Sequence, residues 1–381
     1  MELAGLVPLG DYRAPALPTE EKVSAAFARL KAMFLARSGQ DVIASDRLET
    51  PSLRRLDEAA QPPACAPLLN DLDLAMRQWL ERPVAAGTVL AVITPPSDRS
   101  DVVGSWAAQA GLRPMSPPTT RTGELDLNAL QNMDDREPLV VPRLEKWFIR
   151  SPEGIERMRK LLTILSVKRR VLIGCNSFAW AFFVKAIRLD LIAPGPFTFR
   201  PFDGAMLEQW LVELASDEIA DGAGFRLADS GGYLLREGAE QETSHFFQTL
   251  AGRSLGIPSI AWHMWRDMLR IDDIDEHADG SQGQHSKQRE TFWIAAMDEL
   301  VLPGTYPREL LFALHALCLH GSLTPQELLS VVPETAGVGV VPALRGSRFV
   351  QFENGALGIR PEAYPSVRAG LQTSGFPMGA I

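Results

Sequence analysis

The sequence contains few cysteines and no long uninterrupted apolar run. Its three cysteines, Cys65, Cys175 and Cys318, lie far apart and are odd in number. Their spacing fits neither a disulfide framework nor a zinc site, so we expect a protein of a reducing, cytoplasmic compartment with no bound metal. The most apolar stretch, residues 178–187, is interrupted by Lys185 and is too short to span a membrane. The first residues lack the basic and apolar regions of a signal peptide.

Positive charge is also in short supply. Lysine and arginine total 38 against 47 for aspartate and glutamate, which gives a formal net charge of −9 at pH 7. This balance argues against broad binding to nucleic acid or to an anionic membrane surface. With 46% hydrophobic residues, a chain of 381 residues is long enough for two or three domains and a large buried core.

The middle of the chain predicts a strand, a short loop and a helix. Residues 89–93 (VLAVI) are typical of a buried strand, and residues 94–99 of a sharp turn. Residues 100–110 predict a helix that ends at Gly111. A strand, a loop and a helix in this order form the frame of a phosphate-binding loop.

The segments that follow alternate between strands and helices. Apolar strands are predicted at residues 112–118, 139–141, 170–175 and 197–202. Helices are predicted between and after them, at residues 125–133, 152–165, 176–189 and 204–216. Because these strands are apolar throughout instead of alternating with polar residues, we predict an α/β fold with a parallel sheet covered by helices on both faces.

The flanking regions predict further segments. Two helices are predicted before the sheet, at residues 19–39 and 68–80, and residues 217–240 predict a loop or insertion. Helices at residues 243–270 are followed by a polar loop at 271–289. The last part predicts three helices and then two strands that turn at Asn354 and Gly355, the order of a winged helix. The predicted divisions are residues 1–82, 83–216, 217–300 and 301–381.

Taken in this order, residues 68–365 resemble P-loop ATPases of the AAA+ and STAND kind. In such proteins the nucleotide loop follows the first core strand, an acidic strand end follows the third, and a polar residue ends the fourth. A helical lid, and often a winged helix, come after. The corresponding segments here are TPPSDRS (residues 94–100), LVVPRLE (139–145), LIGCNS (172–177), the helices at 243–270 and the C-terminal residues.

The loop departs from the pattern that this resemblance implies. A working loop needs glycines to turn backbone N–H groups toward phosphate, a lysine for the β- and γ-phosphates, and a serine or threonine for Mg²⁺. Here Asp98, Arg99 and Ser100 stand at that place, and Pro95 and Pro96 each remove one N–H donor. Asp98 would repel a phosphate charge at ~4 Å by several kcal/mol. In the alternative interpretation, this segment caps the following helix and Arg99 is paired locally.

The other two motifs are altered as well. Arg143 stands where the resemblance implies an aspartate that binds Mg²⁺, and Glu145 is the nearest acid. Asn176 fits the polar position, although it could equally cap the next helix. Arg266, in the predicted lid, could reach a phosphate or be an ordinary surface arginine. The candidate nucleotide-binding residues are therefore Asp98, Arg99, Ser100 and Arg266, and the candidate catalytic residues are Glu145 and Asn176.

Two further features are weaker. His315 and His320 flank Cys318 on one predicted helix, but their spacing gives no good metal-binding face, and burial is the favoured interpretation. Arg345 and Arg348 are the only basic residues near the third helix of the predicted winged helix. DNA recognition needs more positive charge there, so contact with protein is favoured.

Three functions follow from these features. The leading prediction is a degenerate P-loop ATPase, a pseudo-ATPase that needs no cofactor and acts as a scaffold or regulator through protein partners. The second is a divergent ATP-binding protein or ATP hydrolase that uses ATP and Mg²⁺. The third is a winged-helix DNA-binding regulator. The sequence leaves open the identity of the partner and whether the chain forms a homo-oligomer.

Overall fold

The structure, a computed structural model, describes residues 3–18, 48–63, 65–82, 88–121, 123, 138–167, 170–220, 223–228, 231–235, 242–272, 291–297, 300, 302, 307–336 and 339–381. Contacts divide the chain into two compact units. The first contains Met1–Tyr12, Ala64–Arg200 and Leu300–Ile381, and the second contains Arg13–Pro63 and Pro201–Glu299.

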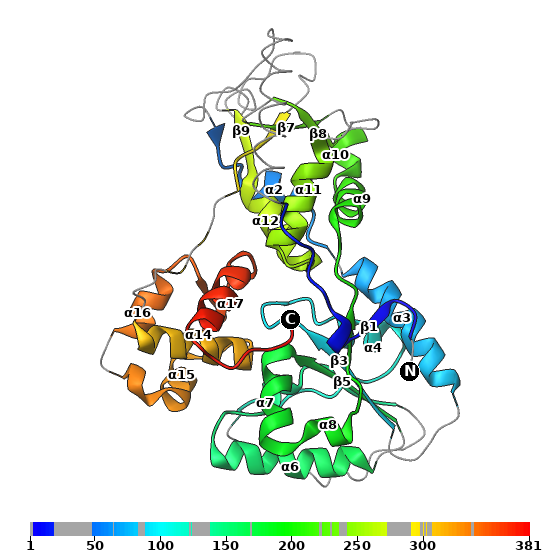
Figure 1. The fold of residues 1–381 in the computed structure, drawn as a ribbon, viewed down its shortest axis with the longest axis vertical. Helices are drawn as coiled ribbons and strands as arrows, with labels where there is room; N and C mark the ends of the chain where they lie inside the picture. The colour runs from blue at the N-terminus through cyan, green and yellow to red at the C-terminus, as the bar shows by residue number, and fades with distance from the viewer. Residues whose placement is uncertain are drawn as a thin grey trace. The chain divides into compact units, whose positions relative to one another are not determined.

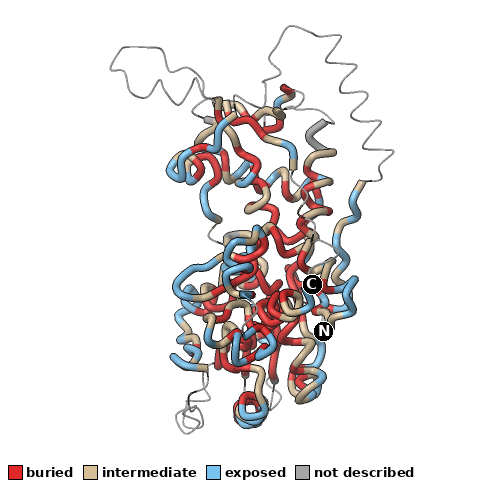
Figure 2. The backbone as a smooth tube through the Cα atoms, turned by 90° about the vertical axis from the view of Figure 1, so that its left-hand side faces the viewer, coloured by how far each residue is buried: buried red, intermediate tan, exposed pale blue. Residues whose placement is uncertain are grey.

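The first unit is built on a five-stranded sheet (Figure 1). Its strands lie in the order β1 (Leu6–Pro8), β6 (Phe197–Phe199), β3 (Thr88–Thr94), β5 (Arg170–Asn176) and β4 (Leu139–Val141). Strands β6, β3, β5 and β4 are parallel, whereas β1 pairs antiparallel with β6. Most residues of β3, β4, β5 and β6 are buried, in keeping with their apolar sequences, whereas β1 at the edge of the sheet buries only Leu6. Figure 2 colours the buried backbone red.

Helices cover both faces of this sheet. On one face α3 (Ala66–Glu81) packs against α4 (Val102–Gln109), and on the other α6 (Pro152–Ser166) packs against α7 (Ser177–Ile187) and α8 (Leu189–Ile192). Helix α4 connects β3 to β4, whereas α6 and α7 connect strands in the opposite direction across the sheet. Right-handed crossovers therefore place α4 opposite α6 and α7. The predicted fold class is confirmed.

The N-terminal residues belong to this sheet instead of forming a separate segment, because β1 extends its edge and α3 covers it. The 3₁₀ turn η1 (Leu9–Asp11) follows β1. Residues 112–118 form no strand, although the Met115 N–H donates to the Val140 carbonyl of β4 at 2.8 Å. The predicted helices at 19–39 and 125–133 lie outside the described residues.

The C-terminal module, residues 307–381, has the predicted winged-helix order. Its helices are α14 (Arg308–His320), α15 (Pro325–Val331) and α16 (Val340–Arg345), and they precede the antiparallel strands β11 (Val350–Glu353) and β12 (Ala356–Ile359). The turns η5 (Pro333–Thr335) and η6 (Pro361–Ala363) and the helix α17 (Tyr364–Thr373) complete it. Thr324 and Glu327 form a capping box at the start of α15. The hairpin turns at Asn354 and Gly355, as predicted, and both have positive φ.

The second unit contains a sheet that the sequence did not predict. Its order is β2 (Leu48–Glu49), β9 (Leu269–Asp272), β10 (Thr291–Ile294), β7 (Gly224–Leu227) and β8 (Tyr233–Leu235). Its helices are α2 (Leu53–Ala59), α9 (Gly204–Leu214), α10 (Ser216–Ala220), α11 (Glu242–Arg253) and α12 (Pro258–Met268). Rings of Phe225, Phe292 and Trp265 pack in its core, with centroids 5.3 and 5.8 Å from that of Phe225.

This second unit corrects two expectations. The predicted lid helices are present as α11 and α12, but they belong to a unit with a sheet of its own. Residues 217–240, interpreted as a loop, include most of α10 together with β7 and β8. The units also divide the chain differently from the four predicted segments, because α9 lies in the second unit and residues 300–381 lie in the first.

Candidate functional site

The three segments that the resemblance singled out lie together, at the C-terminal ends of adjacent strands in the first unit's sheet. Strands β3, β5 and β4 are adjacent and parallel, with Thr94 opposite Asn176 and Val141 opposite Ile173. The residues that follow these strands therefore meet. These three strands bring together four side chains, which we call the strand-end cluster: Asp98, Arg143, Glu145 and Asn176.

The loop after β3 is closed on itself. One carboxylate oxygen of Asp98, Oδ1, accepts hydrogen bonds from the Ser100 backbone N–H at 2.9 Å and from the Ser100 hydroxyl at 2.6 Å. The Asp98 N–H donates to the Pro95 carbonyl at 3.1 Å, and Asp98 is only 5% exposed. The loop thus engages its own Asp98 carboxylate and Ser100 hydroxyl, the group that a nucleotide loop would offer to Mg²⁺, although the buried Ser97 hydroxyl has no hydrogen-bond partner.

Asp101 caps the helix that follows this loop. It has a positive φ of 42°, and its Oδ1 accepts a hydrogen bond from the Gly104 N–H at 3.3 Å. The helix cap is therefore Asp101, the residue directly after the segment that the sequence suggested as the cap. The cavity in front of the loop has a volume of about 10 Å³, and it is lined by Thr94, Asp98, Asp101, Val102, Val103, Pro142 and Arg143. That volume is comparable to the space needed by one water molecule.

Arg143 and Glu145 form a half-buried ion pair after β4. The Arg143 Nε donates to Glu145 Oε1 at 3.0 Å, and its Nη2 donates to the Asp98 carbonyl at 3.0 Å. Glu145 is 1% exposed, and its other oxygen accepts the Asn176 N–H at 3.2 Å. Burial by itself would lower the pKa of Arg143, but Glu145, Asp98 and Asp101 raise it above its usual value. Both carboxylate oxygens of Glu145 are therefore already bonded within the protein.

Asn176 connects β5 to the C-terminal module. Its Oδ1 accepts the Ala179 N–H at 2.8 Å, so the helix-cap interpretation is confirmed. Its Nδ2 donates to the Leu319 carbonyl of α14 at 3.1 Å, and the residue is fully buried. A polar side chain at this strand end thus serves as a cap and as a tie to α14.

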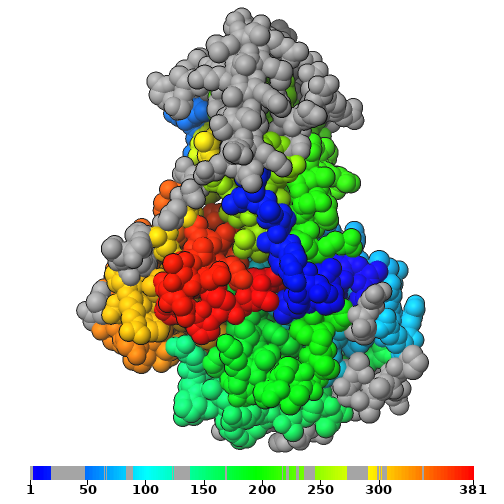
Figure 3. Space-filling model, viewed as in Figure 1, coloured from blue at the N-terminus to red at the C-terminus, as the bar shows by residue number. Residues whose placement is uncertain are grey.

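The C-terminal module also contacts other residues that follow these strands. Arg99 pairs with Glu353 of β11 at 2.7 Å, although the sequence had suggested a local partner. Lys146 donates to the Ser322 hydroxyl at 2.5 Å, and Arg150 donates to the Val331 carbonyl at 3.1 Å. The Ser177 hydroxyl donates to the Ile381 carbonyl. Figure 3 shows the red C-terminal residues lying against the green surface that contains α7.

Lys146 is the titratable group that sequence reasoning missed. It lies on the 3₁₀ turn η3 (Leu144–Trp147), directly after Glu145. Burial, together with the nearby Arg121 and Arg143, lowers the pKa of Lys146 to about 7. Its only signal in the sequence was its place after an apolar strand, because the residues that perturb it come from distant segments.

This lowered pKa predicts a pH dependence of stability. The unfolded chain holds the Lys146 proton more tightly than the folded one, so the free energy of unfolding should rise as the pH increases from about 7 toward the usual lysine value near 10. The slope would be up to about 1.4 kcal/mol per pH unit. Denaturant titrations between pH 6.5 and 9.5 should show this rise in the wild type but not in Lys146→Met. Lys160→Met, at an exposed lysine on α6, should keep it.

Arg266 belongs to the second unit and has partners there. Its guanidinium pairs with Asp57 at 2.6 Å and lies over the ring of Trp262, 5.4 Å from the centroid. It also donates to the Ala60 carbonyl at 3.4 Å. Its role as a nucleotide contact stays a prediction.

The histidine-bearing helix α14 is part of the core. His320 is fully buried and its ring packs against that of Phe148, with centroids 4.7 Å apart. Cys318, on the same helix, is also buried. Within the described part of the chain, no group of three or more His, Cys, Asp or Glu residues could hold a metal ion. Arg345 lies over the ring of Phe352 at 4.2 Å, and DNA binding by this module stays a prediction.

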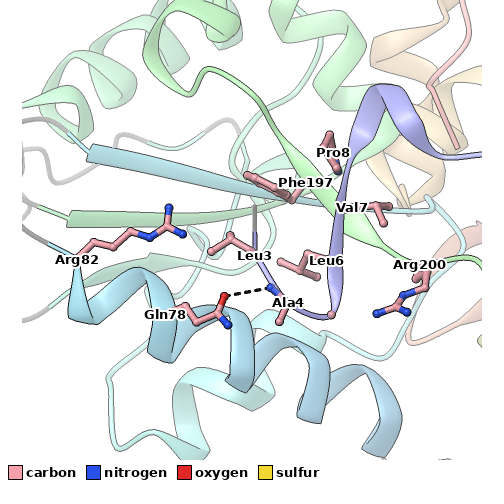
Figure 4. Close-up of a pocket in the computed structure, with 10 residues that line it drawn as sticks. Leu3, Ala4, Leu6, Val7, Pro8, Gln78, Arg82, Phe197 and Arg200 are labelled. Carbon is pink, nitrogen blue, oxygen red and sulfur yellow. Dashed lines mark hydrogen bonds between the residues drawn. The ribbon is translucent and has the colours of Figure 1, made fainter. Parts of the chain in front are cut away.

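A groove of about 980 Å³ lies elsewhere in the first unit, between β1 and α3 (Figure 4). Gln78 accepts the Ala4 N–H across it at 3.1 Å. Its lining comprises residues 3–8, Gln78, Arg82, Phe197 and Arg200. None of the candidate site residues lines it.

No family model matches this sequence, and no curated protein matches it. Among solved structures, the chain is similar to Cdc6p from Pyrobaculum aerophilum at 13% identity, over 83% of this chain and 97% of that one, with a TM-score of 0.31. It is also similar to the ORC2 protein of Aeropyrum pernix, solved in ADPNP–ADP complexes, at 12% identity over 96% of each chain and the same TM-score. Scores this low assign neither a function nor a binding site.

Among the helices of the described ranges, none is both long and apolar enough to cross a bilayer.

Proposed function

We propose that this protein is a catalytically inactive relative of the AAA+ and STAND ATPases, and that it acts as a scaffold or regulator through protein partners. One observation carries the proposal: the protein's own groups satisfy one another where a nucleotide and its metal would bind. Asp98 is bonded to Ser100, and Arg143 is bonded to Glu145.

The energetics support this interpretation. A triphosphate at the loop would have to displace the Asp98 carboxylate from Ser100, and each hydrogen bond to a charged group is worth about 1.5–3 kcal/mol. Mg²⁺ at the end of β4 would meet the Arg143 guanidinium, and the Glu145 oxygens that could bind it are already engaged. Contacts between α14 and Asn176 would have to open as well.

Protein partners are favoured over nucleic acid by charge and by packing. The chain carries a net charge of −9, which opposes non-specific binding to a polyanion. Arg345, one of the two basic residues of the predicted recognition region, is stacked on Phe352 within its own module. The partner and the oligomeric state would be found by purifying the full chain with its bound proteins.

A nucleotide titration tests this proposal. We expect 1 mM ATP or ADP with Mg²⁺ to leave Tm unchanged, whereas micromolar binding would stabilise the protein by about 4 kcal/mol. Arg99→Ala should change the unfolding free energy by no more than about 1 kcal/mol, because its pair with Glu353 is solvent-exposed. The divergent ATPase would be favoured instead by a nucleotide-induced rise in Tm that disappears in Arg99→Ala and Ser100→Ala.

A further inference from the structure

Three cationic side chains converge beside the turn after α14. Arg121, Arg143 and Lys146 act on one another electrostatically, and Lys146 reaches Ser322 of the C-terminal module. A Cβ atom at Gly321 would lie 3.7 Å from Lys146 Nζ and 3.9 Å from Arg143 Nη2. The same atom would lie 3.8 Å from the Pro96 carbonyl oxygen, so Gly321 stands beside two cationic nitrogens and one acceptor. We call Arg121, Arg143, Lys146 and Gly321 the cationic corner.

Lys146 is bonded to a hydroxyl and not to a carboxylate. The charged groups that act on Lys146 are Arg121, Arg143, Glu145 and Glu327, which cancel among themselves. Glu145 is bonded to Arg143, and Glu327 lies 3.8 Å from Arg121. Lys146 itself is bonded to a neutral hydroxyl. Lys146 therefore has no bonded carboxylate among these groups, whereas Arg143 is bonded to Glu145 and also faces Asp98 and Asp101.

Two buried polar groups at the same place lack partners. Within the described ranges, the Nη1 of Arg121 is buried and makes no hydrogen bond. His320, the residue directly before Gly321, is fully buried, and neither of its ring nitrogens makes a hydrogen bond. Arg121 and Lys146 both act electrostatically on His320, so these groups lie in one neighbourhood. Leaving buried donors unpaired is costly, and a bound ligand is one way to satisfy them.

We propose that the cationic corner binds a small tetrahedral oxyanion of the phosphate type. Such an anion matches the chemistry present, because guanidinium and ammonium donors form strong charge-assisted hydrogen bonds to its oxygens. Arg121, Arg143, Lys146 and Gly321 are each partly exposed as residues, whereas the unpaired Nη1 of Arg121 is buried and would meet the anion inside the corner. The anion would tie the turn at Gly321 and Ser322 to the end of β4. This site goes beyond the proposed function: it shares Arg143 with the strand-end cluster, but it uses neither the Asp98 carboxylate nor the Ser100 hydroxyl.

Binding at this corner should be linked to protonation. An anion beside Lys146 favours its charged form, so binding takes up a proton when the pH is above the pKa of the free group. The charged and titratable groups that face Lys146 are Arg121, Arg143, Glu145, Glu327 and His320. Sulfate is a dianion between pH 6.5 and 8.5, so a pH dependence of its binding arises from the protein.

The test is a titration of the full chain with sodium sulfate or inorganic phosphate, at constant ionic strength set with NaCl. We expect a saturable rise in Tm of about 3 °C at ten times Kd, on top of the non-saturating effect that sulfate has on any protein. The sulfate Kd should be at least about threefold lower at pH 6.5 than at pH 8.5. Lys146→Met should lose the saturable response, and Lys160→Met should retain it.

One further variant keeps this test decisive. Lys146→Met removes a cation from between two arginines, so it should fold; Arg121→Gln is the second variant and should weaken sulfate binding about tenfold. The inference is wrong if the wild type shows no saturable response, or if Lys146→Met responds like the wild type.

ATP is the remaining ligand to compare, because its phosphates share this chemistry. A response to ATP that needs Lys146 but not Ser100 would identify a nucleotide as the source of the phosphate and would support the site. A response that needs Ser100 but not Lys146 would contradict the proposed function, and the sulfate titration would still decide this inference.

Discussion

Replacing either partner of the Arg143–Glu145 pair alone is expected to cost about 3–5 kcal/mol of unfolding free energy. Glu145 is 1% exposed, so Arg143→Met would leave the Glu145 carboxylate buried without a bonded counter-ion. Glu145→Met would leave the Arg143 Nε and the Asn176 N–H without their acceptor. Denaturant unfolding of each variant measures the loss.

The double variant separates the cost of an unpaired charge from the value of the pair. Because two apolar side chains leave no uncompensated charge, Arg143→Met with Glu145→Met should recover at least half of the loss of either single variant. If Glu145 were instead a catalytic base free to meet substrate, its replacement would leave stability nearly unchanged. A loss of less than about 1 kcal/mol in Glu145→Met would therefore contradict the structural role proposed here.

Asn176→Ala is expected to cost about 2–4 kcal/mol, because it removes two interactions at once. The variant loses the cap on α7, worth about 1 kcal/mol, and leaves the buried Leu319 carbonyl without its donor. The second loss acts on the attachment of the C-terminal module, so protease cleavage of that module should become faster.

Ser151→Ala is the matched control for this variant. Ser151 caps α6 through the Gly154 N–H at 3.0 Å. It should cost only about 1 kcal/mol. The difference between the two variants isolates the Asn176 contact with α14. Equal losses would show that this contact contributes nothing, and the interpretation of Asn176 as a residue that senses nucleotide would regain support.

Elements with strong local signals were predicted well. Strands β3 and β5 each have seven residues with a buried apolar middle, and they formed where expected. Ser151 and Thr324 cap their helices as predicted, because a cap depends only on residues within one turn. The sheet of the second unit escaped prediction because its strands have two to four residues and pair over long separations, as β2 does with β9.

The resemblance singled out three segments that lie together at the C-terminal ends of adjacent strands, but the sequence did not predict how their side chains would pair. Asp98, Glu145 and Asn176 meet because they follow adjacent parallel strands. Arg99, in contrast, found its partner 254 residues away, in Glu353. Pairings of that kind depend on how separate modules pack, which no local pattern encodes.

By itself, the sequence determined the alternation of strands and helices, the missing glycines of the loop, and the cation in place of an acid after β4. These are properties of residue type and short spacing, which act before any distant contact forms. The tertiary structure alone decided that the loop closes through Asp98, that α14 lies against the same edge, and that Lys146 is left beside two arginines. Those outcomes arise from burial and from charges brought together across the chain, and both exist only once the modules have packed.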